Sequence, residues 1–296
     1  FGGLCRFDGE HMEVFDTVTG TGLRGNRVAC LFEGRDGTLW VGSDQSGLAS
    51  FHDGRFQSYP AVEAGLILTL AEDSAGRLLV GTTSALLRRE GDAFRPVHEG
   101  ELRNVRRILP RRSGELLAAA GDGVWRFDDA RAQRLAVGNA QCLVELDGLV
   151  LVGTDKGLFQ LAPDGLEPWL RSPELRQTIH ALSVAADGAL WIGCEAGVIR
   201  IAPADLPDPG ADSAAAEALE LTPTAEVPSA RVLFEDREGG IWLGHSERGL
   251  TRLCPAEALR RGTETGLPPR GIVTVLGDGQ GELFVGTSRG LLRSRA

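Results

Sequence analysis

Short apolar runs separated by glycine-containing turns recur along the whole chain. One clear copy has apolar runs at 28–32 and 39–41, a turn at Gly37 between them, Gly42 after the second run, and a third run at 48–51. Apolar runs of about four to eight residues bounded by glycine are typical of β-strands. Helical segments do not alternate with these runs, so the pattern predicts an all-β chain and excludes a TIM barrel.

The same pattern occurs seven times, with turn glycines 34 to 51 residues apart and about 41 on average. Three residues after each turn glycine stands a bulky apolar residue. Five residues after it stands another glycine, except in the third copy, where Ala119 takes this place. The turn glycines are Gly37, Gly76, Gly114, Gly148, Gly188, Gly239 and Gly281.

A repeat of about 40 residues with up to four strands is the sequence signature of a β-propeller. We therefore predict a seven-bladed β-propeller of four-stranded antiparallel blades, formed as a single domain by residues 1–296. The first residues match the third and fourth strands of a unit, and the last unit stops after its third strand. We expect the ring to close by strand exchange between the termini, with 12–15 as the outer strand of the last blade. The extra third-strand copy at 3–7 has no place in this scheme.

One insertion, residues 202–228, breaks the period and is rich in Pro, Ala and Asp. We interpret it as an exposed loop between blades, in which Asp212 caps the start of a short helix.

Composition narrows the functional classes. Hydrophobic residues are 42% and charged residues 24% of the chain, as in soluble folded proteins. A net charge of -10 repels phosphate backbones, so we expect no nucleic-acid partner. No apolar run reaches the ~18 residues of a membrane span, and the start of the chain resembles no signal peptide. We expect a domain cut from a longer chain, attached to a membrane only through segments outside this sequence.

The chemistry-bearing residues form no recognisable catalytic or metal motif. The five cysteines include no C-x-x-C pair, and the five histidines lack the spacing of metal ligands. The glycine motif at 20–25 is not followed by a helix, and G-x-S-x-G at 286–290 is a copy of the repeat's own turn. We therefore predict no metal, no cofactor and no catalytic residue.

Three units resemble the two-component regulator propeller repeat: LFEGRDGTLWVGSDQSGLASF at 31–51, LSVAADGALWIGCEAGVIRI at 182–201 and LFEDREGGIWLGHSERGLTRL at 233–253. The linker GLRGNRV at 22–28 is also similar to this family, and the resemblance covers nearly the whole chain. It implies the sensor region of a bacterial signalling protein, placed outside the cytoplasmic membrane ahead of a membrane helix and a histidine kinase or diguanylate cyclase output. The family motif specifies blades and not a ligand, so it transfers no binding residues.

The loops that enter the innermost strands surround one mouth of a propeller's channel, and polar residues gather at that position of the sequence. Such a ring of arginines with Asn and His could bind a carboxylate or another anion bidentately. Alternatively, these arginines cap strand ends and pair with acidic neighbours. The candidate ligand-binding residues are Arg27, Asn104, Arg106, His180, Arg231 and Arg270.

The tryptophans offer no sugar-stacking site. Trp40, Trp191 and Trp242 share one place in the repeat, which indicates core packing between blades. Trp125 and Trp169 are less regular, and we expect them to be more exposed.

Three functions remain open at this point. The leading hypothesis is a non-enzymatic sensor that passes the binding of a small molecule, a glycan or a protein partner to an output domain. The second is a propeller lyase or a sialidase-like hydrolase, because the Asp-Gly turns loosely resemble sialidase aspartate boxes. The third is a plain protein-interaction platform. A homodimer is compatible with each.

Overall fold

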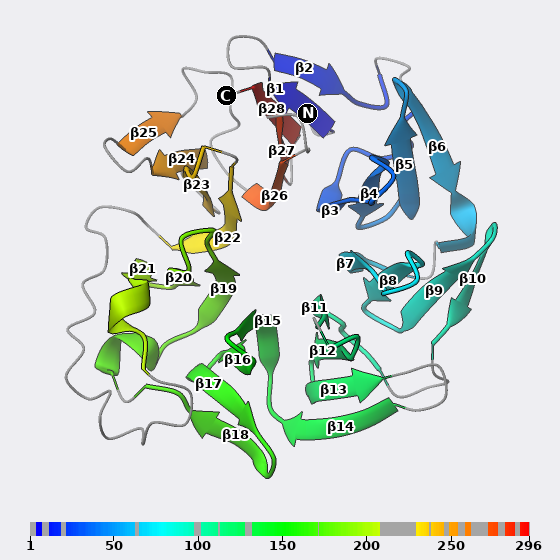
Figure 1. Cartoon of the computed structure of the whole chain (residues 1–296). Helices are drawn as coiled ribbons and strands as arrows, with labels where there is room; N and C mark the ends of the chain where they lie inside the picture. Colours follow the sequence, from blue (N-terminus) through cyan, green and yellow to red (C-terminus); the bar gives the residue numbers. More distant parts are fainter. Residues whose placement is uncertain are drawn as a thin grey trace.

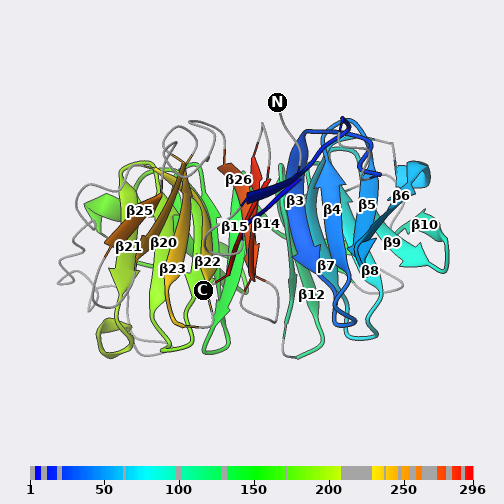
Figure 2. The same ribbon diagram turned by 90° about the horizontal axis from the view of Figure 1, so that it is seen from above.

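Sheets of short antiparallel strands stand in a ring around a central axis (Figure 1). The computed structural model describes residues 4–7, 12–18, 22–62, 65–97, 102–111, 113–127, 132–170, 172–207, 229–236, 238–245, 249–253, 258–261, 272–277, 282–287 and 291–295. Seen from the side, the strands run between the two faces of the ring (Figure 2). We call the face at which the chain enters the innermost strands the entry face, and the opposite face, where these strands turn into the second strands, the turn face.

Within the described residues, six blades are each made of strands that follow one another in the chain, and we number them 1 to 6 in chain order. Their innermost strands are β3 (Val28–Glu33), β7 (Ile67–Glu72), β11 (Arg107–Pro110), β15 (Ala140–Leu146), β19 (Ile179–Val184) and β22 (Ala230–Glu235). The second strands are β4 (Leu39–Ser43), β8 (Leu78–Thr82), β12 (Leu116–Ala120), β16 (Leu149–Thr154), β20 (Leu190–Cys194) and β23 (Ile241–His245).

The outer half of each blade follows the same order. The third strands are β5 (Leu48–His52), β9 (Leu86–Glu90), β13 (Gly123–Phe127), β17 (Gly157–Ala162), β21 (Gly197–Ile201) and β24 (Gly249–Leu253). The outer strands are β6 (Arg55–Tyr59), β10 (Ala93–Pro96), β14 (Ala132–Val137), β18 (Gly165–Pro168) and β25 (Ala258–Arg261). Blade 5 has three strands within the described residues.

The two ends of the chain meet in a closing sheet that is not a regular blade. It contains β26 (Ile272–Gly277), β27 (Glu282–Thr287), β28 (Leu291–Arg295), β1 (Leu4–Phe7) and β2 (Met12–Phe15). Its order is β2-β1-β27-β26, and β28 pairs with β27 as well. At Leu283 and Phe284, β27 pairs with both β1 and β28.

The predicted ring of seven four-stranded blades is therefore wrong. The structure has six blades of consecutive strands and one five-stranded closing sheet built from both ends of the chain. The physical reason is that β1 and β28 are both copies of a third strand, and both pair with β27. Counting repeat units could not show that both strands pair with β27 in one sheet. The all-β prediction and the antiparallel pairing are confirmed.

The glycine that ends the second strand is required by the next blade. A Cβ on Gly42 would lie 2.5 Å from Cys30 Sγ and 2.7 Å from Ile67 Cγ2, which belongs to blade 2. The same holds in blade 4, where a Cβ on Gly153 would lie 2.8 Å from Ile179 Cγ2 of blade 5. Contacts this short leave no room for a side chain, so close approach of neighbouring blades explains the repeated glycine.

The tryptophans of the repeat pack between the blades, as predicted. Trp40, Trp191 and Trp242 are buried, with exposed fractions of 4%, 8% and 3%. Trp125 and Trp169 are also buried, at 6% and 4%, so the expectation that they are more exposed is wrong. Trp125 lies on β13 and donates its indole N–H to Asp122, so a third-strand position provides burial that the second-strand pattern did not predict.

The insertion at 202–228 begins with a short 3-10 helix, η3 (Pro203–Asp205). Residues 208–228 lie outside the described residues, and with them the predicted cap at Asp212.

Candidate functional site

A β-bulge near the start of the innermost strand sets one residue of blades 1, 2, 4, 5 and 6 apart at the entry face. The ladder shifts between Ile179 and Ala181 in blade 5, and between Ala230 and Val232 in blade 6. Blades 1, 2 and 4 have the same shift. Bulges redirect a side chain and are common beside functional sites. His180 and Arg231 therefore occupy the same position in neighbouring blades.

These positions divide the entry face, around the central axis, into an apolar and a polar side. In blade 3 the ladder begins with the pair Arg107–Ala119, so Arg106, whose backbone N–H donates to Ala119, takes the corresponding place. Blades 1 and 2 contribute apolar side chains, whereas blades 3 to 6 contribute hydrogen-bond donors. In blade order the residues are Ala29, Leu68, Arg106, Gln141, His180 and Arg231. We call the last four the donor arc.

His180 and Arg231 act on each other electrostatically. Burial lowers the pKa of the His180 imidazole, the charge of Arg231 lowers it further, and Glu195 opposes both effects. Half-buried His180 is therefore neutral at pH 7, while Arg231 is exposed to solvent and charged. His180 and Arg231, two of the six predicted residues, are thus close enough for the charge of one to affect the pKa of the other.

Arg106 joins two blades. Its Nη1 group donates to Asn139 Oδ1 and, over 3.1 Å, to the carbonyl of Ala140 at the start of β15. Asn139 Nδ2 in turn donates to Asp155 over 3.3 Å. The guanidinium is therefore held at the boundary of blades 3 and 4 by polar groups of the neighbouring blade.

The other predicted residues are placed differently. Arg27 pairs with Asp44 over 2.8 Å, as the alternative interpretation of these arginines expects. Asn104 has a φ of +51° and packs its side chain over Gly121 of the same blade. Arg270 lies outside the described residues. The role of all six in ligand binding stays a prediction.

Arg107 is a residue that the sequence analysis missed. It lies on β11, the innermost strand of blade 3. Its side chain is exposed to solvent, although protein atoms lie around its guanidinium group. Desolvation lowers the pKa of its guanidinium, and Cys142 of blade 4 acts in the opposite direction. Burial raises the pKa of the Cys142 thiol to about 12, so this cysteine carries no charge at neutral pH. The sequence feature that could have indicated Arg107 is Ala119, the residue that stands in place of the repeat's second glycine, because Arg107 pairs with it.

Neither a metal site nor a membrane span emerges from the described residues. Their His, Cys, Asp and Glu side chains form no group of three or more that could hold a metal ion. Within the same part of the chain, none of the helices has the length and apolar character needed to cross a bilayer.

Two solved structures with a similar fold are extracellular domains of two component systems. The extracellular domain of a protein described as a hybrid two component system from B. thetaiotaomicron has a TM-score of 0.80 and 18% identity, over 96% of this chain and 41% of its own. A second such domain from the same organism has a TM-score of 0.76 and 17% identity, over 99% and 40%. This chain thus spans about two fifths of their length, and identities this low show the fold alone.

An enzyme shares the fold as well. Virginiamycin B lyase from Staphylococcus aureus, crystallised as an inactive variant with quinupristin, has a TM-score of 0.72 and 12% identity, over 90% of this chain and 94% of its own. Fold likeness therefore does not decide between a sensor and an enzyme.

The sequence itself identifies the repeat. No curated protein matches the chain. Residues 22–45 match the model of the two component regulator propeller family. These residues include the whole linker at 22–28 and the part of the first unit up to residue 45 on which the resemblance was based. The chain therefore carries the two component regulator propeller repeat, as its sequence predicts.

Proposed function

We propose that this propeller is the non-enzymatic, extracytoplasmic sensor region of a bacterial signalling protein, and that the donor arc at its entry face binds an anionic ligand. The observation that carries the proposal is one position near the start of the innermost strand, which is the bulge residue in blades 4 to 6 and the residue just before the ladder in blade 3. It gives blades 3 to 6 the donors Arg106, Gln141, His180 and Arg231, while blades 1 and 2 have Ala29 and Leu68. The family repeat and the fold shared with extracellular domains of two-component systems support the sensor role.

The chemistry of the donor arc favours an anion. Guanidinium groups donate two parallel hydrogen bonds to a carboxylate, sulfate or phosphate, and they keep their charge at every physiological pH. Arg107 adds a second guanidinium next to Arg106 in the chain, on the innermost strand of blade 3. A ligand held between blades 3 and 6 would favour one arrangement of these blades, and such a bias can be passed to an output domain.

The test uses simple anions as probes: acetate, succinate, sulfate and phosphate. We expect at least one to raise the melting temperature of the purified protein saturably. The double variant Arg106→Glu/Arg231→Glu should lose this response, because two donors become acceptors. Arg95→Glu is the control, since Arg95 is 71% exposed on the outer strand of blade 2, where it pairs with Glu90. No response to any probe, or an equal response in the double variant, contradicts the anion site.

The non-enzymatic role has its own test. A ligand identified in this way should be recovered unchanged, by mass spectrometry, after long incubation with the protein. Conversion of the ligand would favour the lyase or hydrolase hypothesis instead. A protein partner or a homodimer stays a prediction that size-exclusion chromatography with light scattering would examine.

A further inference from the structure

Blade 6 contains a polar cluster of three side chains behind its tryptophan. Trp242 Nε1 donates to Asp236 Oδ2 over 2.7 Å, and Arg252 Nε donates to the same oxygen over 2.7 Å. The Arg252 guanidinium lies over the Trp242 ring, 5.4 Å from its centroid. Arg252 also lies 3.5 Å from Glu238, the residue just before the turn glycine. The cluster thus fills the space at the turn face with an arginine held by carboxylates.

Blade 5 repeats the arrangement with one carboxylate. Arg200 pairs across the strands with Trp191 and lies over its ring at 5.7 Å. Its Nη2 group is 2.7 Å from Asp187, which again precedes the turn glycine. Blades 5 and 6 therefore share a guanidinium between the tryptophan and the turn carboxylate.

Blade 1 keeps the tryptophan and the turn carboxylate but lacks both of their partners. Ser50 pairs with Trp40 at the place of Arg252, and Gly34 stands where blade 6 has Asp236. Within the described contacts Asp36 makes no ion pair, and the Trp40 indole N–H donates no hydrogen bond although Trp40 is only 4% exposed. Asp36 Oδ1 still accepts the backbone N–H of Thr38 over 2.9 Å, but Asp36 and the Trp40 indole lack the side-chain partners that their counterparts have in blade 6.

A cavity of about 400 Å³ occupies this place, between blades 1 and 2 at the turn face. Its lining includes Asp36, Trp40, Glu72, Arg89 and Asp92. Three polar atoms converge around Gly34: a Cβ built on this residue would lie 2.9 Å from Asp36 Oδ1, 2.9 Å from Glu72 Oε1 and 3.4 Å from Trp40 Nε1. Glycine at this position keeps the space between them open.

The charges of the lining are of both signs. The Glu72 side chain is only 10% exposed. Its Oε2 accepts the backbone N–H of Arg35 and lies 3.6 Å from Arg35 Nε, whereas Oε1 is directed at the Gly34 side. Arg89 comes from blade 2 and lies over the Trp40 ring at 5.1 Å. The full lining carries the carboxylates of Asp36, Glu72 and Asp92, the guanidinium groups of Arg77 and Arg89, and the Trp40 indole. A ligand here needs a cationic donor group beside an anionic acceptor group.

We propose that this cavity binds the head group of an α-amino acid. The ligand's ammonium group donates to Asp36 Oδ1 and Glu72 Oε1, in place of the arginine that blades 5 and 6 supply. Its carboxylate accepts from Trp40 Nε1 and pairs with Arg89. A cavity of this volume is in the range of small-molecule sites, so it also accommodates a side chain. The site lies on the opposite face from the donor arc, and it stands independently of the function proposed above.

Isothermal titration calorimetry of the purified protein with each of the twenty common L-amino acids tests the proposal. We expect at least one to bind saturably. Asp36→Asn should weaken that affinity about tenfold or more, because it removes one of the two carboxylate charges that face the ligand's ammonium group. Asp187→Asn is the matched control: it changes the same turn position in blade 5, where Arg200 already occupies the carboxylate, so it should leave the affinity unchanged.

A second variant tests the geometry separately from the charge. Gly34→Ala places a methyl group between Asp36 and Glu72, and it should abolish binding while the circular dichroism spectrum stays that of the parent protein. The amine formally derived from the bound amino acid by loss of its carboxylate should bind much more weakly. The proposal fails if no amino acid binds, if Asp36→Asn binds as tightly as the parent protein, or if the amine binds as tightly as the amino acid.

Discussion

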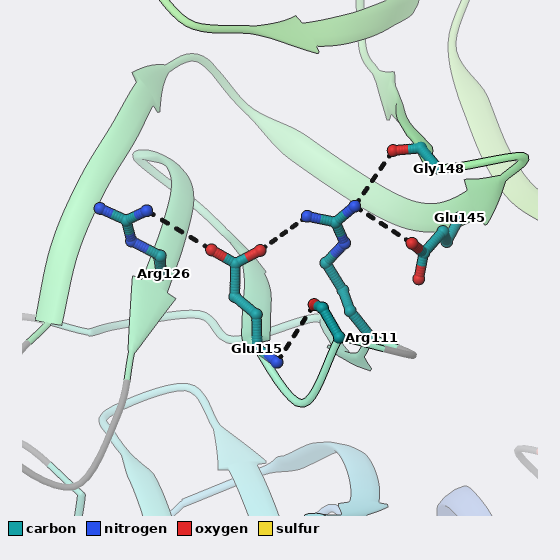
Figure 3. Close-up of polar contacts among 6 residues, drawn as sticks. Arg111, Glu115, Arg126, Glu145 and Gly148 are labelled. Carbon is teal, nitrogen blue, oxygen red and sulfur yellow. Dashed lines mark hydrogen bonds and ion pairs between the residues drawn. The ribbon is translucent and has the colours of Figure 1, made fainter.

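Arg111 Nη2 lies 3.1 Å from Glu145 Oε1, and this contact ties the turn of blade 3 to the innermost strand of blade 4 (Figure 3). The same group donates to the carbonyl of Gly148, and Arg111 Nη1 pairs with Glu115 over 2.7 Å. Two other junctions use a glutamate at the same strand position, with backbone N–H groups as donors: Arg35 to Glu72 over 3.3 Å, and Ala186 to Glu235 over 2.7 Å. Ring assembly thus relies on polar contacts as well as on the packed apolar faces.

The Arg111–Glu145 pair should contribute measurably to stability. Its side chains are only 21% and 17% exposed, so solvent screens their attraction less than that of a surface pair. A double-mutant cycle with Arg111→Ala and Glu145→Ala, followed by urea unfolding, should give a coupling energy of about 1 kcal/mol or more. The control is Arg95–Glu90, which has the same 3.1 Å distance but is 71% and 50% exposed. Its coupling should be about 0.5 kcal/mol or less, and equal couplings would contradict the role of burial.

Gly42→Ala should destabilise the ring through contacts between blades. The new methyl group would meet Cys30 Sγ at 2.5 Å and Ile67 Cγ2 at 2.7 Å, so we expect a loss of about 1–3 kcal/mol in the free energy of unfolding. Adding Ile67→Ala should recover part of the loss caused by the methyl group, which a double-mutant cycle measures. The reverse change, Ala119→Gly, is the control and should cost about 1 kcal/mol or less. Purely additive effects of Gly42→Ala and Ile67→Ala would show that the two blades do not meet here.

Asp73 should make the protein sensitive to acid. Burial alone would raise the pKa of this carboxyl, but the backbone and side-chain hydrogen bonds of Arg77 hold it below the ordinary value of 3.8. A lowered folded-state pKa means that this stabilisation is complete above the unfolded value and is lost as the pH falls through the folded one. Urea unfolding should therefore show that the stability gap between the parent protein and Asp73→Asn narrows below about pH 4. Asp164→Asn, at an exposed turn between β17 and β18, is the control.

The sequence predicts the parts of this fold that follow from local repetition. Glycines such as Gly42 and tryptophans such as Trp242 recur because every blade meets the next in the same way, so their spacing indicates a ring of sheets. The closing sheet could not be predicted, because β1 and β28 carry the same third-strand pattern and only spatial pairing shows that both contact β27.

The two candidate sites also differ in how far the repeat predicts them. The bulge that gives His180 and Arg231 equivalent positions follows from the register of the repeat, so counting back from the turn glycines located both residues. The turn-face cavity results from departures from the repeat, at Gly34 and Ser50, and their effect is visible only beside the cluster that Asp236 and Arg252 form in blade 6. Differences between repeats are therefore more informative about sites than the repeat itself.

Anion binding at the donor arc should strengthen as the pH falls. In the free protein, burial and the charge of Arg231 lower the pKa of His180 below 6.5, so the imidazole is neutral at pH 7. A bound anion offsets the charge of Arg231 and favours the imidazolium, so binding takes up a proton. Calorimetry with a probe that keeps its own charge over this range, such as sulfate, should therefore give a higher affinity at about pH 5.5 than at about pH 7.5.

His180→Gln separates this effect from the general pH dependence of the protein. The variant should bind the probe with an affinity that hardly changes over the same range, because glutamine keeps a donor but does not titrate. Its stability without ligand should also respond less to acid. The unfolded chain binds a proton at His180 more readily than the folded protein does, so the parent protein loses stability as the pH falls through about 6.5. An affinity that is independent of pH in the parent protein, or equally dependent on pH in His180→Gln, would exclude His180 from the binding site.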